Sequence, residues 1–374
     1  MNPSAQPFSN RPPQPNRNIR VLVVDDSAIV RRLLTDTISA EADMEVVGTA
    51  PDPFIARDKI LSLQPDVLTL DIEMPRMNGL TFLKKLMIYR PMPVIVISSL
   101  SQASCEISME ALRCGAVDVM GKPDGPYSVG DLRSALASKL RAAVHARIRK
   151  PAVKIVPSQP ITHLAAPLLQ HSFAENAVLA IGASTGGTEA IREVLEALPA
   201  SVPGIVIAQH IPPVFSAAFA NRLNRLCALE VKEAQNGDEV LPGRAFVAPG
   251  NFHMILRRTS NRYRIEIQDG PMVCYQRPSV DVLFSSVAEA AGNKATGILL
   301  TGMGSDGAQG LLRMRQAGAK TIAQDEESCI VYGMPREAVE LGAAMQVLPL
   351  LDIAPALAAA ANPAIAPASG VMTG

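Results

Sequence analysis

The chain has 374 residues, 48% of them hydrophobic, and this length favours two domains over a single core. Lys+Arg and Asp+Glu both number 35, so the net charge is zero and no basic domain indicates binding to nucleic acid. The five cysteines are scattered without a Cys-x-x-Cys pair. That pattern argues against a disulfide framework or a zinc site and is typical of a reducing cytoplasm.

Neither end of the chain is typical of a membrane anchor. Residues 1–18 are rich in proline and lack an apolar core, so we expect a disordered arm rather than a signal peptide. The most apolar stretch, residues 341–362, is interrupted by Gln346, Pro349, Asp352 and Pro355. It therefore predicts a last strand, a closing helix and an Ala/Pro-rich tail over 356–374, not a membrane span. We expect a cytoplasmic protein without membrane insertion.

Residues 19–147 predict a first α/β domain. Short apolar runs alternate with helical stretches, which predicts a parallel sheet. The predicted strands are 19–27, 44–50, 66–74, 93–100 and 117–123. Residues 148–176 follow, rich in proline and weakly periodic, and predict a linker.

Residues 177–355 predict a second α/β domain, again with helices between strands and with an antiparallel hairpin near 254–268. Its predicted strands are 177–184, 204–210, 244–250, 254–258, 263–268, 295–301, 320–325 and 344–350. The clearest helical stretches are 187–198, 214–226, 280–292 and 307–317. The expected fold class is α/β, with two doubly wound and mostly parallel sheets.

Polar side chains follow the predicted strands of the first domain: Asp25, Asp26, Asp71, Ser98 and Lys122. The carboxyl ends of parallel strands meet in one crevice, so these groups should lie together. Three carboxylates there repel one another unless a hard divalent cation such as Mg²⁺ lies among them. A carboxylate beside Mg²⁺, a lysine and a hydroxyl can accept a phosphoryl group. Taken singly, each aspartate is also explained as a helix cap, but the five positions together favour the phosphoryl site.

The first domain closely resembles the receiver domains of two-component response regulators, which are flavodoxin-like. The motifs that carry the resemblance are "VVDDS", "LDIEMPRMNG", the serine that ends "VIVIS", and "GKP". The resemblance implies that Asp71 is the phosphoacceptor and that Asp25 and Asp26 join it in holding Mg²⁺. It assigns the switching roles to Ser98 and Lys122.

In the second domain, "IGASTGG" places Ser184 on a glycine-rich turn between a strand and a helix. The turn matches Gly-x-Ser-x-Gly, a nucleophile signature, although such turns also bind phosphates. A dinucleotide site is disfavoured because no acidic residue ends the next strand, which closes with His210. His210 can reach the Ser184 crevice as a general base, and His253 is its rival.

A serine–histidine pair needs a buried carboxylate that orients the imidazole. Asp306 lies in "LTGMGSDG", a second glycine-rich turn after a strand, while Asp281 and Asp325 are competitors. The order Ser…His…Asp differs from the Ser…Asp…His order of α/β-hydrolases. The match to the serine motif therefore does not indicate a lipase-type enzyme.

The second domain resembles the Rossmann-like catalytic domain of the chemotaxis protein-glutamate methylesterases, the CheB family. The resemblance rests on "IGASTGG", "AQHIP", "RPSVDVLF" and "LTGMGSDG", and extends over about residues 178–350. It implies Ser184 as nucleophile, His210 as base and Asp306 as its orienting partner. The resemblance also implies that Met303 contributes a backbone N–H to the oxyanion hole, and we expect Thr185, just before the helix that starts at Gly186, to contribute another.

The resemblance implies a phosphorylation-activated hydrolase that demethylates glutamate methyl esters on chemoreceptors and deamidates glutamines. It implies a CheA-type histidine kinase as phosphodonor, chemoreceptors as substrate, Mg²⁺ in the receiver and no cofactor for the ester chemistry. We expect a monomer that does not bind nucleic acid. Two other classes are a DNA-binding response regulator, which needs a basic helix-turn-helix that residues 178–350 lack, and a serine hydrolase of soluble esters or peptides.

Overall fold

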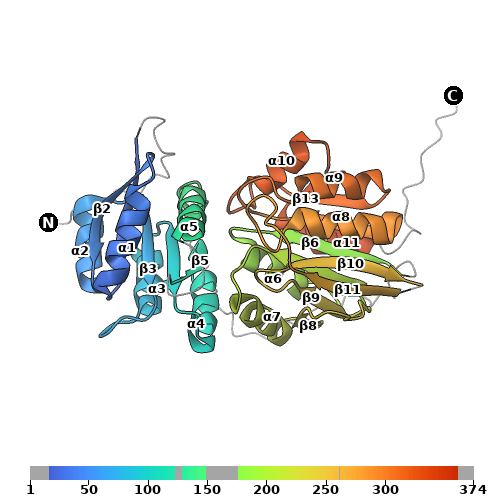
Figure 1. Cartoon of the computed structure of the whole chain (residues 1–374), viewed down its shortest axis with the longest axis horizontal. Coiled ribbons are helices and arrows are strands. Elements are labelled where there is room, and N and C mark those ends of the chain that lie inside the picture. The colour runs from blue at the N-terminus through green and yellow to red at the C-terminus, as the bar shows by residue number, and fades with distance from the viewer. Residues whose placement is uncertain (1–16, 123–128, 149–175, 261, 361–374) are drawn as a thin grey trace, which may run out of the picture.

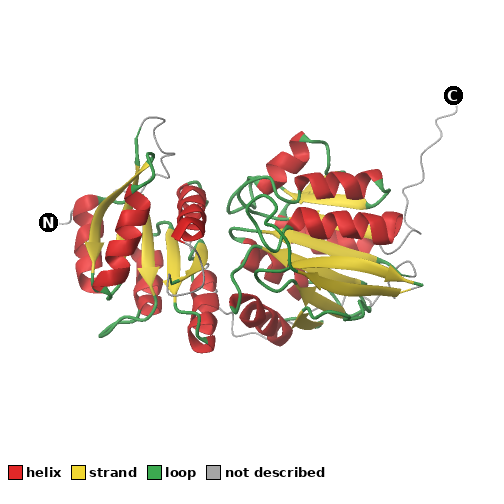
Figure 2. Cartoon of the chain, in the orientation of Figure 1, coloured by secondary structure: helices red, strands yellow, loops and turns green. Residues whose placement is uncertain are grey.

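The computed structural model describes residues 17–122, 129–148, 176–260 and 262–360. They form two α/β domains, N-terminal and C-terminal, each built on a parallel sheet with helices packed against it (Figures 1 and 2). The helices α4 and α5 of the N-terminal domain lie on the side that faces the C-terminal domain. The predicted fold class is confirmed. The predicted arm and linker lie almost wholly outside the described residues.

The N-terminal domain has a five-stranded sheet in the order β2-β1-β3-β4-β5, with all neighbours parallel. Its direction of winding reverses between β1 and β3, so the two loops that follow these strands diverge and leave a crevice. The strands are β1 (Ile19–Val24), β2 (Met44–Ala50), β3 (Val67–Asp71), β4 (Val94–Ser98) and β5 (Asp118–Gly121). The helices are α1 (Ala28–Ser39), α2 (Pro53–Leu63), α3 (Gly79–Tyr89), α4 (Gln102–Arg113) and α5 (Val129–Val144).

Four of these helices begin where a polar side chain accepts a hydrogen bond from the first helical turn. The caps are Ser27, Asp52, Asn78 and Ser101, at the starts of α1 to α4. Such residues satisfy N–H groups that have no partner inside the helix, which is why the strand-to-helix loops end where they do.

The C-terminal domain has a seven-stranded parallel sheet in the order β14-β13-β12-β6-β7-β9-β8. A separate antiparallel pair, β10 with β11, lies against one face (Figure 2). The strands are β6 (Val178–Ala183), β7 (Gly204–Gln209), β8 (Glu230–Glu233), β9 (Arg244–Val247), β10 (His253–Thr259), β11 (Arg262–Gln268), β12 (Ala295–Leu299), β13 (Lys320–Gln324) and β14 (Gln346–Leu348). The α-helices are α6 (Gly187–Glu196), α7 (Phe215–Leu226), α8 (Val280–Ala291), α9 (Ala308–Gln316), α10 (Met334–Glu340) and α11 (Leu350–Ala360).

Both faces of this sheet are buried, and alternate residues of its central strand enter different cores. Leu179 and Ile181 of β6 join a core with α6, α7 and α11, whereas Val178 and Ala180 join one with α8, α9 and the hairpin. A strand with neighbours on both faces reads as a continuous apolar run, as "VLAI" does. The sheet reverses its winding between β6 and β12, which sets a crevice at their carboxyl ends.

The predicted strands of both domains and the hairpin are found, with two omissions and one correction. The short strand β8 and the short helix α10 were not predicted. Helix α11 continues to Ala360, past residue 356, where the sequence predicted the tail to begin, and it includes Pro355. Within the described ranges, no helix is long and apolar enough to cross a membrane.

Candidate active site

Ser184, His210 and Asp306 come together at the crevice of the C-terminal sheet. They follow the adjacent strands β6, β7 and β12. His210 Nδ1 lies 3.0 Å from Ser184 Oγ, and His210 Nε2 lies 2.7 Å from Asp306 Oδ2. Because a carboxylate only accepts, the neutral imidazole carries its proton on Nε2 and leaves Nδ1 free to accept the serine proton.

The glycines after Ser184 permit the sharp turn. Gly186, the N-cap of α6, has φ 77°, a left-handed conformation that side chains rarely adopt. A Cβ on Gly187 would lie 2.2 Å from Oε1 of Gln209. The turn therefore accepts no side chain at either position, and helix α6 begins directly behind the serine.

Asp306 is a buried carboxylate whose two oxygens accept four hydrogen bonds. Oδ2 accepts from His210 Nε2 and, at 2.7 Å, from the N–H of Val280. Oδ1 accepts from Ser279 Oγ at 2.8 Å and from the N–H of Asp281 at 3.0 Å. Burial raises the pKa of Asp306, but the hydrogen bonds with His210 and the α8 N–H groups outweigh it and hold the pKa below its usual range. The group is thus kept as an anion against the positive end of α8.

The alternative carboxylates and the rival histidine have other partners. Asp281 Oδ1 accepts from the N–H of Gly310 at 2.6 Å, and burial raises the pKa of its carboxyl, with Gly310 opposing. Asp325 Oδ1 accepts from the N–H of Ser328. His253 Nε2 lies 3.0 Å from the carbonyl of Pro271, and its Nδ1 accepts from the N–H of Ser279. Each of these three side chains therefore makes hydrogen bonds with backbone groups outside the Ser184–His210–Asp306 series.

The backbone N–H groups of Thr185 and Met303 lie on the turns after β6 and β12. Among the hydrogen bonds of the described residues, neither N–H donates to a protein acceptor. The two turns are linked, because the N–H of Ser184 donates to the carbonyl of Thr301 at 3.0 Å and Thr301 Oγ1 donates to that of Thr185 at 3.0 Å.

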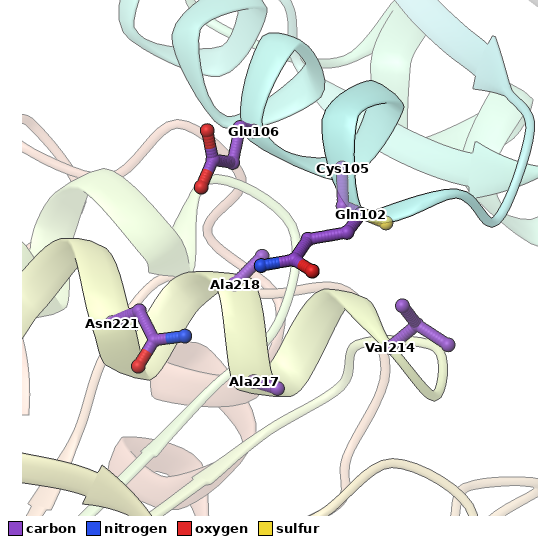
Figure 3. Close-up of a pocket in the computed structure, with 7 residues that line it drawn as sticks. All are labelled: Gln102, Cys105, Glu106, Val214, Ala217, Ala218 and Asn221. Atoms are coloured by element: carbon purple, nitrogen blue, oxygen red, sulfur yellow. The ribbon is translucent and has the colours of Figure 1, made fainter.

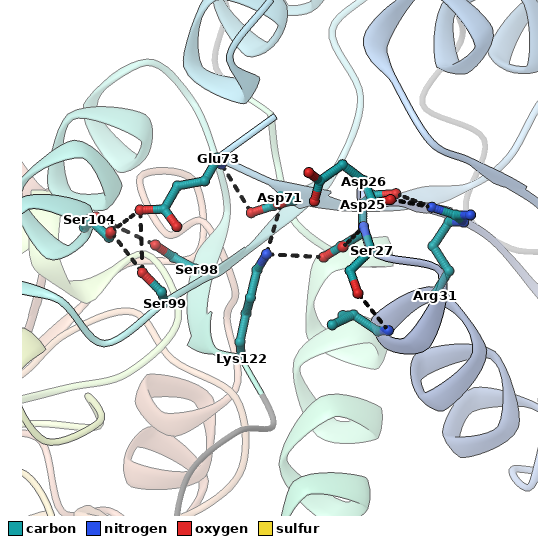
Figure 4. A network of polar contacts seen from close by, with 11 residues as sticks. Asp25, Asp26, Ser27, Arg31, Asp71, Glu73, Ser98, Ser99, Ser104 and Lys122 are labelled. Carbon is teal, nitrogen blue, oxygen red and sulfur yellow. Dashed lines mark hydrogen bonds and ion pairs between the residues drawn. The ribbon is translucent and has the colours of Figure 1, made fainter. Parts of the chain in front are cut away.

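The N-terminal crevice gathers the predicted carboxylates (Figure 4). Oxygens of Asp25, Asp26 and Asp71 lie within 4.8 Å of one another. Lys122 Nζ lies 2.8 Å from Asp71 and 3.5 Å from Asp25 Oδ2, an oxygen that has no hydrogen-bond donor among the residues described. Burial raises the pKa of Asp71 to about 6, although Lys122 opposes it. A buried carboxylate oxygen with only this long ion pair to Lys122, together with crowded anions, fits a hard divalent cation.

Ser98 ends β4 beside this cluster and is fully buried, with Oγ 3.5 Å from the carbonyl of Ser104. Ser104 lies in the first turn of α4 and donates to Glu73, which also accepts from Ser99 (Figure 4). A polar network therefore connects the end of β4, the loop after Asp71 and the start of α4.

The N-terminal domain contacts the turn after β6 and the loop after β13, which is hydrogen-bonded to the turn after β12. Thr185 Oγ1 donates to Asp118 Oδ2 at 3.1 Å, and Lys139 of α5 pairs with the same oxygen at 2.7 Å. The N–H of Arg147 donates to the carbonyl of Ile330 at 2.9 Å, and its guanidinium reaches Glu326. Met303 packs with Ile330 against the apolar core of β5 and α5.

A second contact joins α4 to α7. The buried guanidinium of Arg222 donates to the carbonyl of Met109 at 3.2 Å and to Glu189 at 2.6 Å. Beside it lies a cavity of about 250 Å³ (Figure 3). It is lined by Gln102, Cys105 and Glu106 of α4 and by Val214, Ala217, Ala218 and Asn221 at α7. No residue of the serine–histidine–aspartate group lines it.

Sequence reasoning missed three groups that contact the site: Gln209, Ser279 and Asp118. Gln209 and Ser279 lie in the quoted motifs "AQHIP" and "RPSVDVLF", where a strand-end glutamine beside a histidine and an N-cap serine were the available signals. Asp118 begins β5 in the other domain, and no local pattern links it to Thr185.

Comparison with known proteins agrees with both domains. Residues 179–357 match the model of the CheB methylesterase family, and residues 21–135 match that of the response regulator receiver domain. A protein-glutamate methylesterase/protein-glutamine glutaminase of Syntrophus aciditrophicus is 56% identical over 336 residues, covering 90% of this chain and 97% of the relative. That of Escherichia coli is 53% identical, covering 90% and 95%. The solved catalytic domain of Thermotoga maritima CheB is 36% identical, covering 50% of this chain and 99% of its own, with a TM-score of 0.49.

Proposed function

This chain belongs to the CheB methylesterase family, and we propose that it hydrolyses glutamate methyl esters on chemoreceptors and deamidates particular glutamines there. The observation that carries the proposal is the hydrogen-bonded series from Ser184 through His210 to a buried, anionic Asp306. Such a series activates a serine for acyl transfer.

Ser184 Oγ attacks the ester carbonyl while His210 Nδ1 takes the hydroxyl proton. The N–H groups of Thr185 and Met303 stabilise the developing oxyanion. The tetrahedral intermediate collapses, the bond to the methoxy group breaks, and the proton passes from His210 to departing methanol. Water, deprotonated by the same His210, then releases a free glutamate carboxylate and Ser184.

A glutamine side chain follows the same steps, with ammonia leaving in place of methanol. Asp306 keeps the imidazole in one tautomer and stabilises its cationic form in both reactions. Each reaction adds a negative charge to the substrate.

The N-terminal domain supplies regulation. Asp71 accepts the phosphoryl group, and Asp25, Asp26 and Asp71 would hold Mg²⁺. The ion when bound would neutralise phosphate charge, and Lys122 would pair with one phosphate oxygen and the hydroxyl of Ser98 with another.

We infer that the unphosphorylated receiver covers the site and that phosphorylation weakens its packing. The contacts of Asp118 with Thr185 and of Arg147 with Ile330 support this. The first engages the turn that carries one oxyanion donor, and the second engages the loop after β13, which is bonded to the turn of Met303 because the N–H of Gly302 donates to the carbonyl of Val331. A receptor helix is too bulky to reach Ser184 past such a contact. Phosphorylation shifts the population by favouring the open state.

The phosphodonor is a CheA-type histidine kinase, and the protein acts as a cytoplasmic monomer. Two alternatives make different predictions. A soluble-ester hydrolase turns over small esters as fast as receptor membranes, and a DNA-binding regulator has no esterase activity at all.

The test is release of labelled methanol from membranes carrying methylated chemoreceptors, with and without a phosphodonor. We expect release that rises with the phosphodonor and is lost in Ser184→Ala. Near-normal release by Ser184→Ala refutes the nucleophile assignment, and equal rates on small esters refute the substrate assignment.

A further inference from the structure

Gln209 is the last residue of β7 and is almost fully buried, 2% exposed, next to His210. Its Nε2 donates to the carbonyl of Ser184 at 2.9 Å and to that of His210 at 3.2 Å. One side-chain amide therefore joins the backbone of the proposed nucleophile to the backbone of the proposed base.

The Ser184 carbonyl belongs to the same peptide group as the N–H of Thr185. A trans peptide is planar, so its C=O and N–H point in opposite directions. The carbonyl oxygen accepts a second bond, at 2.7 Å, from the N–H of Gly187. Two donors on the oxygen fix the direction of the N–H and polarise it as a donor.

The peptide group that follows Thr185 is also fixed by a hydrogen bond. Thr301 Oγ1 donates to the Thr185 carbonyl at 3.0 Å, and the N–H of Thr301 donates to Gln324 Oε1 at 2.8 Å. Both peptide groups around Thr185 are thus anchored through their carbonyl oxygens. The Thr185 N–H cannot reorient without breaking the bonds of Gln209 and Gly187.

Packing alone does not account for an amide at this position. Oε1 of Gln209 has no hydrogen-bond partner among the residues described and lies close against Gly187. An unsatisfied buried oxygen opposes folding, whereas a methionine of similar length would fill the space without that cost. The compensating feature is the pair of hydrogen bonds from Nε2.

We propose that Gln209 is a positioning residue for the ester hydrolysis, which sets the Thr185 N–H toward the oxyanion and keeps Ser184 in register with His210. This rests on the proposed function. Gln209 does not touch the substrate. Its effect passes through the Ser184–Thr185 peptide group, and it is therefore felt in the transition state rather than in substrate binding.

The experiment uses the full-length, phosphorylated protein and methanol release from receptor membranes. Gln209→Met removes both donors at nearly constant volume. Gln209→Asn keeps the amide but is one methylene too short to bridge the two carbonyls. Thr321→Val is the matched control, because Thr321 is also buried in this sheet and bonds Ala343 and Met345 away from the site.

We expect Gln209→Met to lower kcat about 10- to 50-fold, less than the loss of a whole oxyanion donor, with KM within about twofold. Phenylboronic acid, which forms a tetrahedral adduct with the serine, should bind more weakly by a similar factor. The kcat of Gln209→Asn should lie between those of Gln209→Met and wild type, and Thr321→Val should retain the wild-type kcat. The Asn variant supplies the comparison if Met does not fold.

A kcat within twofold of wild type in folded Gln209→Met overturns the positioning role; if Gln209→Met does not fold, the same result in Gln209→Asn overturns it. So does a fall in kcat with unchanged boronic acid affinity. Ser184→Ala is measured alongside. If Ser184→Ala is active, the proposed function fails and the role of Gln209 fails with it. If Ser184→Ala is inactive and Gln209→Met is normal, the role of Gln209 alone fails.

Discussion

The hydrogen bond between Asp118 and Thr185 is the most direct link from the receiver to the proposed oxyanion donors. Asp118→Ala removes the acceptor from this bond. It leaves the interdomain contacts of Arg147 and Arg222 in place. If the receiver restrains the esterase by covering the site, this variant should be partly active without phosphorylation.

The expected increase in the basal rate of Asp118→Ala follows from the bonds of Asp118 that are lost when the two domains separate. Asp118 Oδ1 bonds the N–H of Val119, and Oδ2 pairs with Lys139, both inside the receiver, so these persist when the domains separate. Of the bonds of Asp118, only the one with Thr185 is lost on opening. A hydrogen bond to a charged group contributes about 1.5–3 kcal/mol, and renewed solvation of the carboxylate offsets part of it. A net of about 1 kcal/mol raises the ratio of open to closed molecules roughly fivefold.

The assay is basal methanol release from receptor membranes without phosphodonor. We expect Asp118→Ala to be about fivefold faster than wild type and to match it when both are phosphorylated. Thr185→Val removes the same bond from the other side, so the double variant should be no faster than the faster single one. Asp52→Ala is the control, because Asp52 is a buried receiver aspartate that caps α2 away from the interface.

An unchanged or slower basal rate in Asp118→Ala would refute the covering model at this contact. An equal rise in Asp52→Ala would mean that loss of receiver stability, not loss of the Thr185 bond, releases the enzyme.

Three further predictions concern the two crevices. Asp306→Asn should lower the rate of methanol release by about 10⁴-fold through the wrong imidazole tautomer, whereas Asp281→Asn, bonded to Gly310, should lower it less than tenfold; the reverse order would identify the wrong carboxylate. The lowered pKa of Asp306 means that its contribution to stability is present above pH 3.8 and is lost as the pH falls through the folded-state pKa. The excess unfolding free energy of wild type over Asp306→Asn should therefore shrink as the pH falls below 4. Because burial raises the pKa of Asp71 among other carboxylates, Asp71→Asn should stabilise the chain by about 1 kcal/mol at pH 7.5 without Mg²⁺, and calorimetry with Mg²⁺ should show that gain removed.

Strands were predicted best where both faces of a sheet are covered. The runs that became β1, β6 and β7 are apolar except for Arg20 and Gln209, and apolar runs bounded by turns identify buried parallel strands. Strand β8 was not predicted because "EVKE" at the sheet edge buries only Val231. Helix α10 was not predicted because its seven residues are too few to show a helical period.

The position of each proposed catalytic residue was predictable because parallel strands end at one edge. Strand order was not needed to expect Ser184 near His210, and β6 does neighbour both β7 and β12. The choice among Asp306, Asp281 and Asp325 was different. It depends on which carboxylate faces the imidazole, and that is decided by the docking of the α8 N-terminus on the loop after β12.

Contacts between the domains cannot be predicted from sequence patterns, for a physical reason. Periodicity reports which face of an element is buried, but Asp118 is buried partly by its own domain and partly by Thr185 of the other, and either source produces the same sequence. The same holds for Gln209. A polar residue at the end of a strand is expected to face solvent, and the sequence does not show whether its side-chain amide bonds a neighbouring turn instead. The two residues bond adjacent residues of one turn: Gln209 donates to the carbonyl of Ser184, and Asp118 accepts from the side-chain hydroxyl of Thr185. The groups that orient the proposed oxyanion donor and those that link it to the receiver therefore meet within two residues. Regulation through this contact should alter kcat as well as substrate access.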